Sequence, residues 1–170
     1  MASATQPDGR AEERVLEIVR VLDAPRSLVF KAWTDPAHVT RWMGPRGFTA
    51  SHYQQDQRPG GAWRVCLRRD EDGRELWQGG VLRELVPPER LAFTFAWDQD
   101  DGHPGHETLV TVTFAEEQGR TRMTFRQAVF ASVESRDGHR GGWGSAFDRL
   151  EELIVQATRA GEGWASPVGR

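Results

Sequence analysis

The sequence of 170 residues contains very little of several residue types that would point to a particular chemistry. Cys66 is the only cysteine, so the chain can form neither an internal disulfide nor a metal site built from several cysteines. No apolar run reaches the length of a membrane-spanning helix, and the polar N-terminus lacks the apolar segment of a secretory signal. We therefore expect a cytoplasmic protein without a membrane span.

The sequence also lacks a strong charge bias and the common nucleotide and nucleophile motifs. Its formal net charge is −3 and its pI is near 6.0, which gives no reason to expect binding to nucleic acid. It contains no GxSxG elbow, no P-loop and no GxGxxG segment. These absences predict no cofactor, no metal and no catalytic nucleophile.

Apolar residues at helical spacing dominate the last part of the chain, residues 142–160. They recur at intervals of four, three, four and three, as Trp143, Phe147, Leu150, Ile154 and Ala157. Such an amphipathic helix has to bury its apolar face against another element. The preceding part of the chain offers only a sheet, so we expect a curved sheet to wrap this helix.

Most of the chain before this helix has the alternating pattern of β-strands. The clearest run places Leu91, Phe93, Phe95 and Trp97 at every second position. Residues 14–22 predict a first strand, residues 25–43 predict two short helices, and about six further strands follow with short turns between them. Short turns imply antiparallel pairing, and the missing βαβ alternation indicates an α+β protein.

The organisation is that of one domain with one core. An apolar content of 38% over this length is sufficient for a single hydrophobic core. We expect the domain to span residues 13–160, after a disordered lead at 1–12 and before a flexible tail at 161–170.

Several segments, in order, carry a family resemblance. They read APRSLVFKAWTDPAHVTRWMGP, QRPGGAWR, GGVLRELVPPERLAFTF, TVTF, TRMTF and GGWGSAFDRLEEL. Together they resemble the Bet v 1-like helix-grip (START/SRPBCC) superfamily and, within it, the family related to the C-terminal domain of the activator of Hsp90 ATPase. The resemblance implies a seven-stranded curved antiparallel sheet that grips the long C-terminal helix, with a hydrophobic cavity between them.

Large apolar side chains from the predicted sheet and helices are the candidates for lining this cavity. They are Trp42, Met43, Trp63, Val65, Trp77, Phe93, Phe95, Trp97, Val110, Phe125, Trp143 and Phe147. The alternative is that these rings fill the space and form a solid core. Residues 42–45, at the end of the second short helix, are the predicted gate, because loops move more readily than sheets.

Ionisable residues give weaker signals. Glu84 alternates with Leu82 and Val86, so an inward orientation would make it a half-buried acid or base. We favour a surface or ion-paired glutamate. His103 and His106 lie in a loop rich in glycine, proline and aspartate, which favours a solvated loop over a metal site.

Three functions remain open at this point. The first is non-catalytic binding of a small hydrophobic molecule between sheet and helix, and the second is a polyketide cyclase or aromatase-like enzyme that uses Glu84. The third is an Hsp90-type co-chaperone, which the resemblance implies. Exposed edge strands leave both a monomer and a homodimer open.

Overall fold

The computed structural model describes residues 10–159 and 161, so most of the predicted lead and tail lies outside the described part. The elements, in order, are η1 Ala11–Arg14, β1 Leu16–Leu22, α1 Arg26–Thr34, α2 Pro36–Trp42, β2 Phe48–Gln55, β3 Ala62–Arg69, β4 Glu75–Val86, β5 Arg90–Trp97, β6 Thr108–Glu117, β7 Arg120–Ala128 and α3 Val133–Arg159. The element η1 is a short 3-10 helix. Apart from η1, this order is the one that the periodicity predicts.

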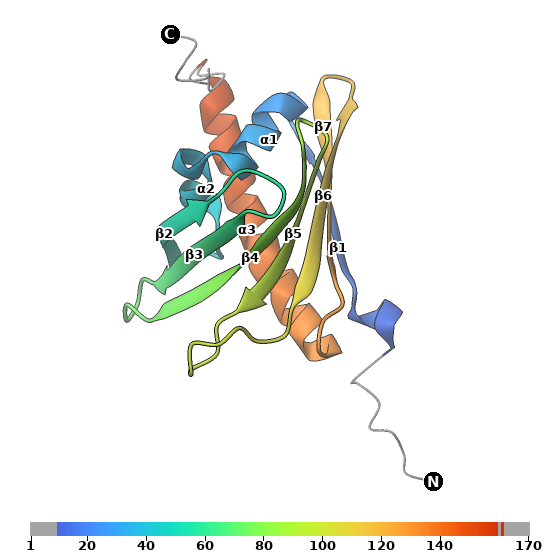
Figure 1. Cartoon of the computed structure of the whole chain (residues 1–170). Coiled ribbons are helices and arrows are strands. Elements are labelled where there is room, and N and C mark those ends of the chain that lie inside the picture. The colour runs from blue at the N-terminus through green and yellow to red at the C-terminus, as the bar shows by residue number, and fades with distance from the viewer. Residues whose placement is uncertain (1–9, 160, 162–170) are drawn as a thin grey trace.

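The seven strands form one antiparallel sheet in the order β1-β7-β6-β5-β4-β3-β2. The sheet curves around α3, and α1 and α2 lie at the C-terminal end of that helix (Figure 1). The α+β helix-grip prediction is therefore confirmed. The two edge strands, β1 and β2, are the first and second strands of the chain, with α1 and α2 between them.

The helix α3 begins much earlier than the predicted residue 142. The glycine-rich stretch before that residue suggested a connection, but it is helical from Val133. Ser132 stabilises this start, because its hydroxyl accepts a hydrogen bond from the backbone N–H of Ser135 at 3.0 Å. The extra turns carry part of the site described below.

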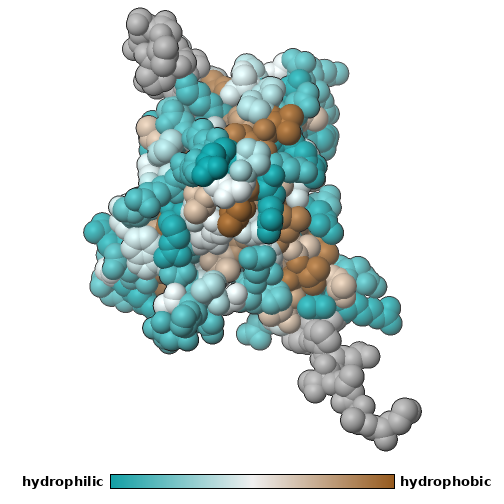
Figure 2. Space-filling view, in the orientation of Figure 1, coloured by the Kyte–Doolittle hydropathy of each residue, from teal (hydrophilic) through white to brown (hydrophobic). Residues whose placement is uncertain are grey.

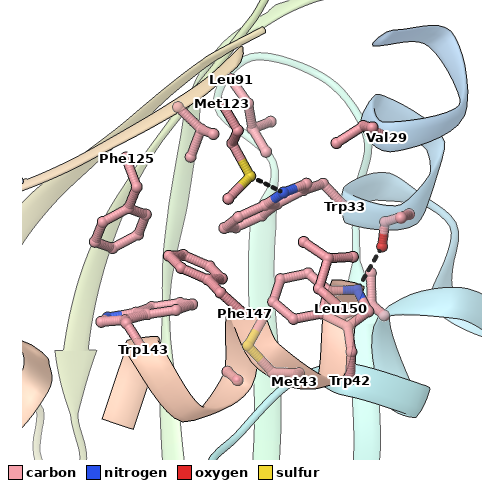
Figure 3. Close-up of a cluster of buried hydrophobic side chains, with 14 of the residues drawn as sticks. Val29, Trp33, Trp42, Met43, Leu91, Met123, Phe125, Trp143, Phe147 and Leu150 are labelled. Atoms are coloured by element: carbon pink, nitrogen blue, oxygen red, sulfur yellow. Dashed lines mark hydrogen bonds between the residues drawn. The ribbon is translucent and has the colours of Figure 1, made fainter. Parts of the chain in front are cut away.

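Trp33 of α1 lies at the centre of the packed core. It lies between the sheet residues Met123 and Phe125 and the α3 residue Phe147 (Figure 3). Its indole N–H points to the Met123 sulfur at 3.3 Å. The centroid of its ring is 5.9 Å from the centroid of the Phe147 ring. The Trp42 ring packs edge-on against the Trp33 ring, with 4.8 Å between the ring centroids. The short helices therefore fill the space between sheet and α3 at this end.

The surface is mostly hydrophilic, with smaller apolar areas (Figure 2). Val19 and Val21 of the edge strand β1 are among the exposed large apolar residues, each with 43% of its surface accessible. Scattered apolar side chains of this kind are normal on folded proteins. Within residues 10–159, no helix has the length and apolar content needed to cross a bilayer.

Candidate functional site

A cavity of about 350 Å³ lies between the sheet and the N-terminal half of α3. Its lining residues come from α3, from β3 to β5 and from the α2–β2 connection. They are Met43, Gly44, Pro45, Phe48, Leu67, Leu76, Gln78, Phe95, Trp97, Ser135, Gly138, His139, Gly142, Trp143 and Ala146. The volume is within the range of about 300–1,000 Å³ that is usual for small-molecule sites.

The position of the cavity follows from what covers α3. From Phe147 onward, the apolar face of α3 is closed off, with Phe147 and Leu150 fully buried. Before Phe147, the helix faces the cavity with residues at positions 135, 138, 139, 142, 143 and 146. Both alternatives of the sequence analysis are thus realised, a solid core at one end of α3 and a cavity at the other.

Trp143 forms one wall of the cavity and is held by a buried polar chain. Its indole N–H donates to Oε1 of Gln127 at 2.8 Å, and Nε2 of Gln127 donates to the Thr108 hydroxyl at 2.8 Å. Gln127 is completely buried. Because both ends of its amide are bonded, the indole has a fixed orientation in the wall.

A second wall pairs Trp97 of β5 with His139 of α3. The Trp97 indole N–H donates to Nε2 of His139 at 2.9 Å, and Nδ1 of His139 lies 2.7 Å from the carbonyl oxygen of Ser135. An indole can only donate, so Nε2 accepts and Nδ1 carries the proton. Burial lowers the pKa of His139, although the hydrogen bond to Ser135 opposes this effect. His139 is therefore neutral at ordinary pH.

The lowered pKa predicts a loss of stability in mild acid. The unfolded chain takes up a proton on His139 as the pH falls below about 6.5, whereas the folded chain resists it. The free energy of unfolding should therefore fall between about pH 7.5 and about pH 5.5, and it should fall less in His139→Gln. Urea unfolding at both pH values measures this. His103→Gln, in the exposed loop, is the control and should keep the full loss.

Gln78 of β4 is a polar group in an otherwise apolar part of the lining. Only 3% of its surface is accessible. Like Leu76, it lines the cavity from the inner face of the sheet. Its side-chain amide makes no hydrogen bond with any residue of 10–159 or 161. The amide borders the cavity, so a hydrogen-bonding group of an occupant can bond to it there.

Two glycines one helical turn apart, Gly138 and Gly142, form part of the α3 surface of the cavity. A Cβ atom built on either one would meet no atom within 4 Å. Each glycine inside a helix costs about 1 kcal/mol relative to alanine. No neighbouring atom would clash with a larger side chain at these positions. The glycines instead leave the helix backbone open to the cavity.

The predicted gate, residues 42–45, leads into the α2–β2 connection, which is fastened to α3. The Arg149 guanidinium donates to the carbonyl oxygen of Gly44 at 2.9 Å and to that of Phe48 at 3.2 Å. The Ser145 hydroxyl also accepts the backbone N–H of Arg46 at 2.9 Å. Movement of this loop would have to break these charge-assisted bonds.

The predicted cavity residues fall into three groups: those that line the cavity, those buried in the core, and Trp77 on the outer face of the sheet. Met43, Phe95, Trp97 and Trp143 line the cavity. Seven others are buried but do not line it, namely Trp42, Trp63, Val65, Phe93, Val110, Phe125 and Phe147. Most of the predicted set therefore belongs to the packed core, because α1 and α2 cover that part of the sheet.

The prediction for Trp77 is wrong. Trp77 pairs with Cys66 across β3 and β4, so it lies on the outer face of the sheet, opposite Val65 and Leu67. There the Arg64 guanidinium lies over its ring at 5.2 Å. The inward residues of this strand are its neighbours in sequence, Leu76 and Gln78.

Glu84 does not face the cavity either, as the favoured surface interpretation expected. The register shifts between Leu82 and Glu84, where Leu82 pairs with Phe93 and Glu84 pairs with Ala92. The extra residue of this bulge turns Glu84 outward. Its carboxylate is exposed and forms an ion pair with Arg90.

Gln78, His139 and the two helix glycines line the cavity but were not predicted from the sequence. A signal for three of them was present, since residues 135, 138, 139, 142, 143 and 146 have the spacing of one helix face. The glycines hid this pattern because they suggested a loop. Gln78 gave no such signal, because a single polar residue in a strand is usually exposed.

His103 and His106 take no part in a metal site among the described residues. Residues 10–159 contain no group of three or more His, Cys, Asp or Glu side chains that could hold an ion. Instead, Nε2 of His106 lies 2.6 Å from the backbone carbonyl oxygen of Val129.

Comparison with known proteins agrees with the fold. The family described as Activator of Hsp90 ATPase homolog 1-like protein matches residues 23–155. No protein of curated function matches the chain. A crystal structure from Chromobacterium violaceum is 29% identical and covers 83% of this chain and 96% of its own, with a TM-score of 0.76.

Two further solved structures are similar. The AHSA1 protein from Silicibacter pomeroyi is 25% identical, with a TM-score of 0.76, and the match covers 84% of this chain and 98% of that one. A protein from Arthrobacter aurescens is 24% identical, with a TM-score of 0.77, over 89% and 92% of the two chains. The last of these supports the fold alone.

Proposed function

Because the chain belongs to the family of Activator of Hsp90 ATPase homolog 1-like proteins, whose helix-grip fold commonly binds hydrophobic ligands, we propose that it binds a small hydrophobic molecule between sheet and helix. The observation that carries this proposal is the cavity of about 350 Å³ beside the N-terminal half of α3. Aromatic walls with a few placed polar groups are typical of ligand sites.

The chemistry of the lining favours binding over catalysis. The cyclase alternative needs an acid or base in the cavity, and its candidate Glu84 lies on the outer face in an ion pair with Arg90. His139 is the ionisable side chain of the lining, and hydrogen bonds occupy both of its ring nitrogens. A general base accepts a proton from the substrate, and in His139 the accepting Nε2 already faces the Trp97 indole N–H.

A neutral fluorescent probe tests the proposal directly. N-phenyl-1-naphthylamine brightens on transfer from water to an apolar site, so we expect saturable binding of one probe per chain. Removing a wall ring in Trp97→Ala should weaken binding by about tenfold, since an aromatic side chain contributes a large apolar contact. The matched variant Trp77→Ala removes the same ring from the outer face and should leave the affinity unchanged. Absence of saturable binding would refute the proposal.

A further inference from the structure

Gln78 is the most deeply buried polar side chain in the cavity wall. Gln78 is nearly fully buried, lines the cavity and has no hydrogen-bond partner among residues 10–159 and 161. The Trp97 and Trp143 indoles and the His139 ring differ, because all are bonded to protein groups. The Ser135 hydroxyl also lacks a partner among residues 10–159 and 161, but Ser135 is only half-buried. The Gln78 amide is thus free to donate one hydrogen bond and accept another.

The shape of the cavity is set by the glycine surface of α3. Gly138 and Gly142 expose the helix backbone directly to the cavity, and a Cβ at either position would meet open space. A ring can therefore lie close to the backbone there, where any other residue would place a side chain. The costly glycines are explained if a flat group occupies this space.

The lining also limits the charge of the occupant. It contains no carboxylate, ammonium or guanidinium group, and His139 is neutral with both nitrogens bonded. An ionised ligand would lose its hydration without gaining a counter-ion, which is strongly unfavourable. An uncharged ligand loses far less hydration.

We propose that the occupant is an uncharged, flat, largely apolar molecule with one hydrogen-bonding group, which the Gln78 side-chain amide recognises while the ring lies on the Gly138–Gly142 face of α3. This inference rests on the proposed function and specifies the ligand of that same cavity. Gln78 is the residue that selects between ligands of equal ring size.

Three compounds with one ring system test this: naphthalene, 2-naphthol and 2-naphthoate. Their dissociation constants are measured by competition with N-phenyl-1-naphthylamine on the full chain and on Gln78→Leu. The ratio of the naphthalene constant to the 2-naphthol constant should be about three- to tenfold larger for the unchanged chain than for Gln78→Leu. Using this ratio removes the difference in hydrophobicity between the two compounds. The carboxylate of 2-naphthoate should weaken binding to the unchanged chain by at least about tenfold relative to 2-naphthol.

Gln54→Leu is the matched control, since Gln54 is exposed on β2 and does not line the cavity. It should keep the full ratio. Gln78→Met provides the same comparison if Gln78→Leu fails to fold. An equal ratio in Gln78→Leu and the unchanged chain, or tight binding of 2-naphthoate, would overturn the inference and leave the proposed function standing. If neither the probe nor any of the three compounds binds, the proposed function itself falls.

Discussion

Replacing Phe147 by alanine should lower the free energy of unfolding by about 3–5 kcal/mol, a large share of the 5–15 kcal/mol typical of a domain. Phe147 is fully buried. The centroid of its ring lies 5.3 Å from that of the Phe125 ring and 5.6 Å from that of the Trp143 ring. It joins α3 to the sheet at the point where the solid core meets the cavity. Alanine would leave a hole that these rigid rings cannot close.

Urea unfolding measures this loss, and Gln156→Ala is the control on the same helix. Gln156 is exposed, so its replacement should change the free energy of unfolding by no more than about 0.5 kcal/mol. Should Phe147→Ala not fold, Phe147→Leu should show a smaller loss in the same direction. A loss below about 1 kcal/mol for the alanine variant would contradict the central place given to this ring.

Replacing Gly142 by leucine should abolish most ligand binding without unfolding the protein. Gly142 lines the cavity and a Cβ there meets no atom within 4 Å, so we expect a leucine side chain to occupy part of the ligand's volume. Overpacking of about 1–3 kcal/mol corresponds to a loss of about fivefold to over a hundredfold in affinity. Leucine is also favoured over glycine in a helix by about 0.8 kcal/mol, so stability should hold or rise.

The adjacent Gly141 gives a matched control for this variant. Gly141 is exposed and does not line the cavity, and a Cβ there also meets no atom within 4 Å. Gly141→Leu should therefore raise helix stability in the same way and keep full affinity for N-phenyl-1-naphthylamine. Equal affinity in both leucine variants would show that the probe binds elsewhere.

Local periodicity was sufficient to predict the architecture. The alternation of Phe93, Phe95 and Trp97 and the helical spacing of Phe147, Leu150 and Ile154 each describe one face of one element. Apolar faces of this kind must be buried against each other, so they predict a sheet packed around a C-terminal helix. These patterns lie within single elements and need no knowledge of distant contacts.

Assignment of residues to the cavity failed where pairing between strands decided the outcome. The bulge between Leu82 and Glu84 depends on the register of β4 against β5, and it reverses the face on which Glu84 lies. Trp77 was assigned to the wrong face for a related reason. The glycines at 79–80 interrupted the alternation that would have linked it to the rest of β4.

Hydrophobic periodicity is a local property, so the residue pattern alone predicted a sheet, a helix that the sheet wraps and a large set of rings between them. Which rings belong to the core and which to the cavity wall depends on contacts between distant parts of the chain. The α1 and α2 helices cover one half of α3 and leave the other half facing a cavity, and that coverage depends on contacts between Trp33, Met123 and Phe147, which are far apart in the chain. The free amide of Gln78 became visible only once its surroundings were known, since whether a buried polar group has a partner is a question of three-dimensional neighbours.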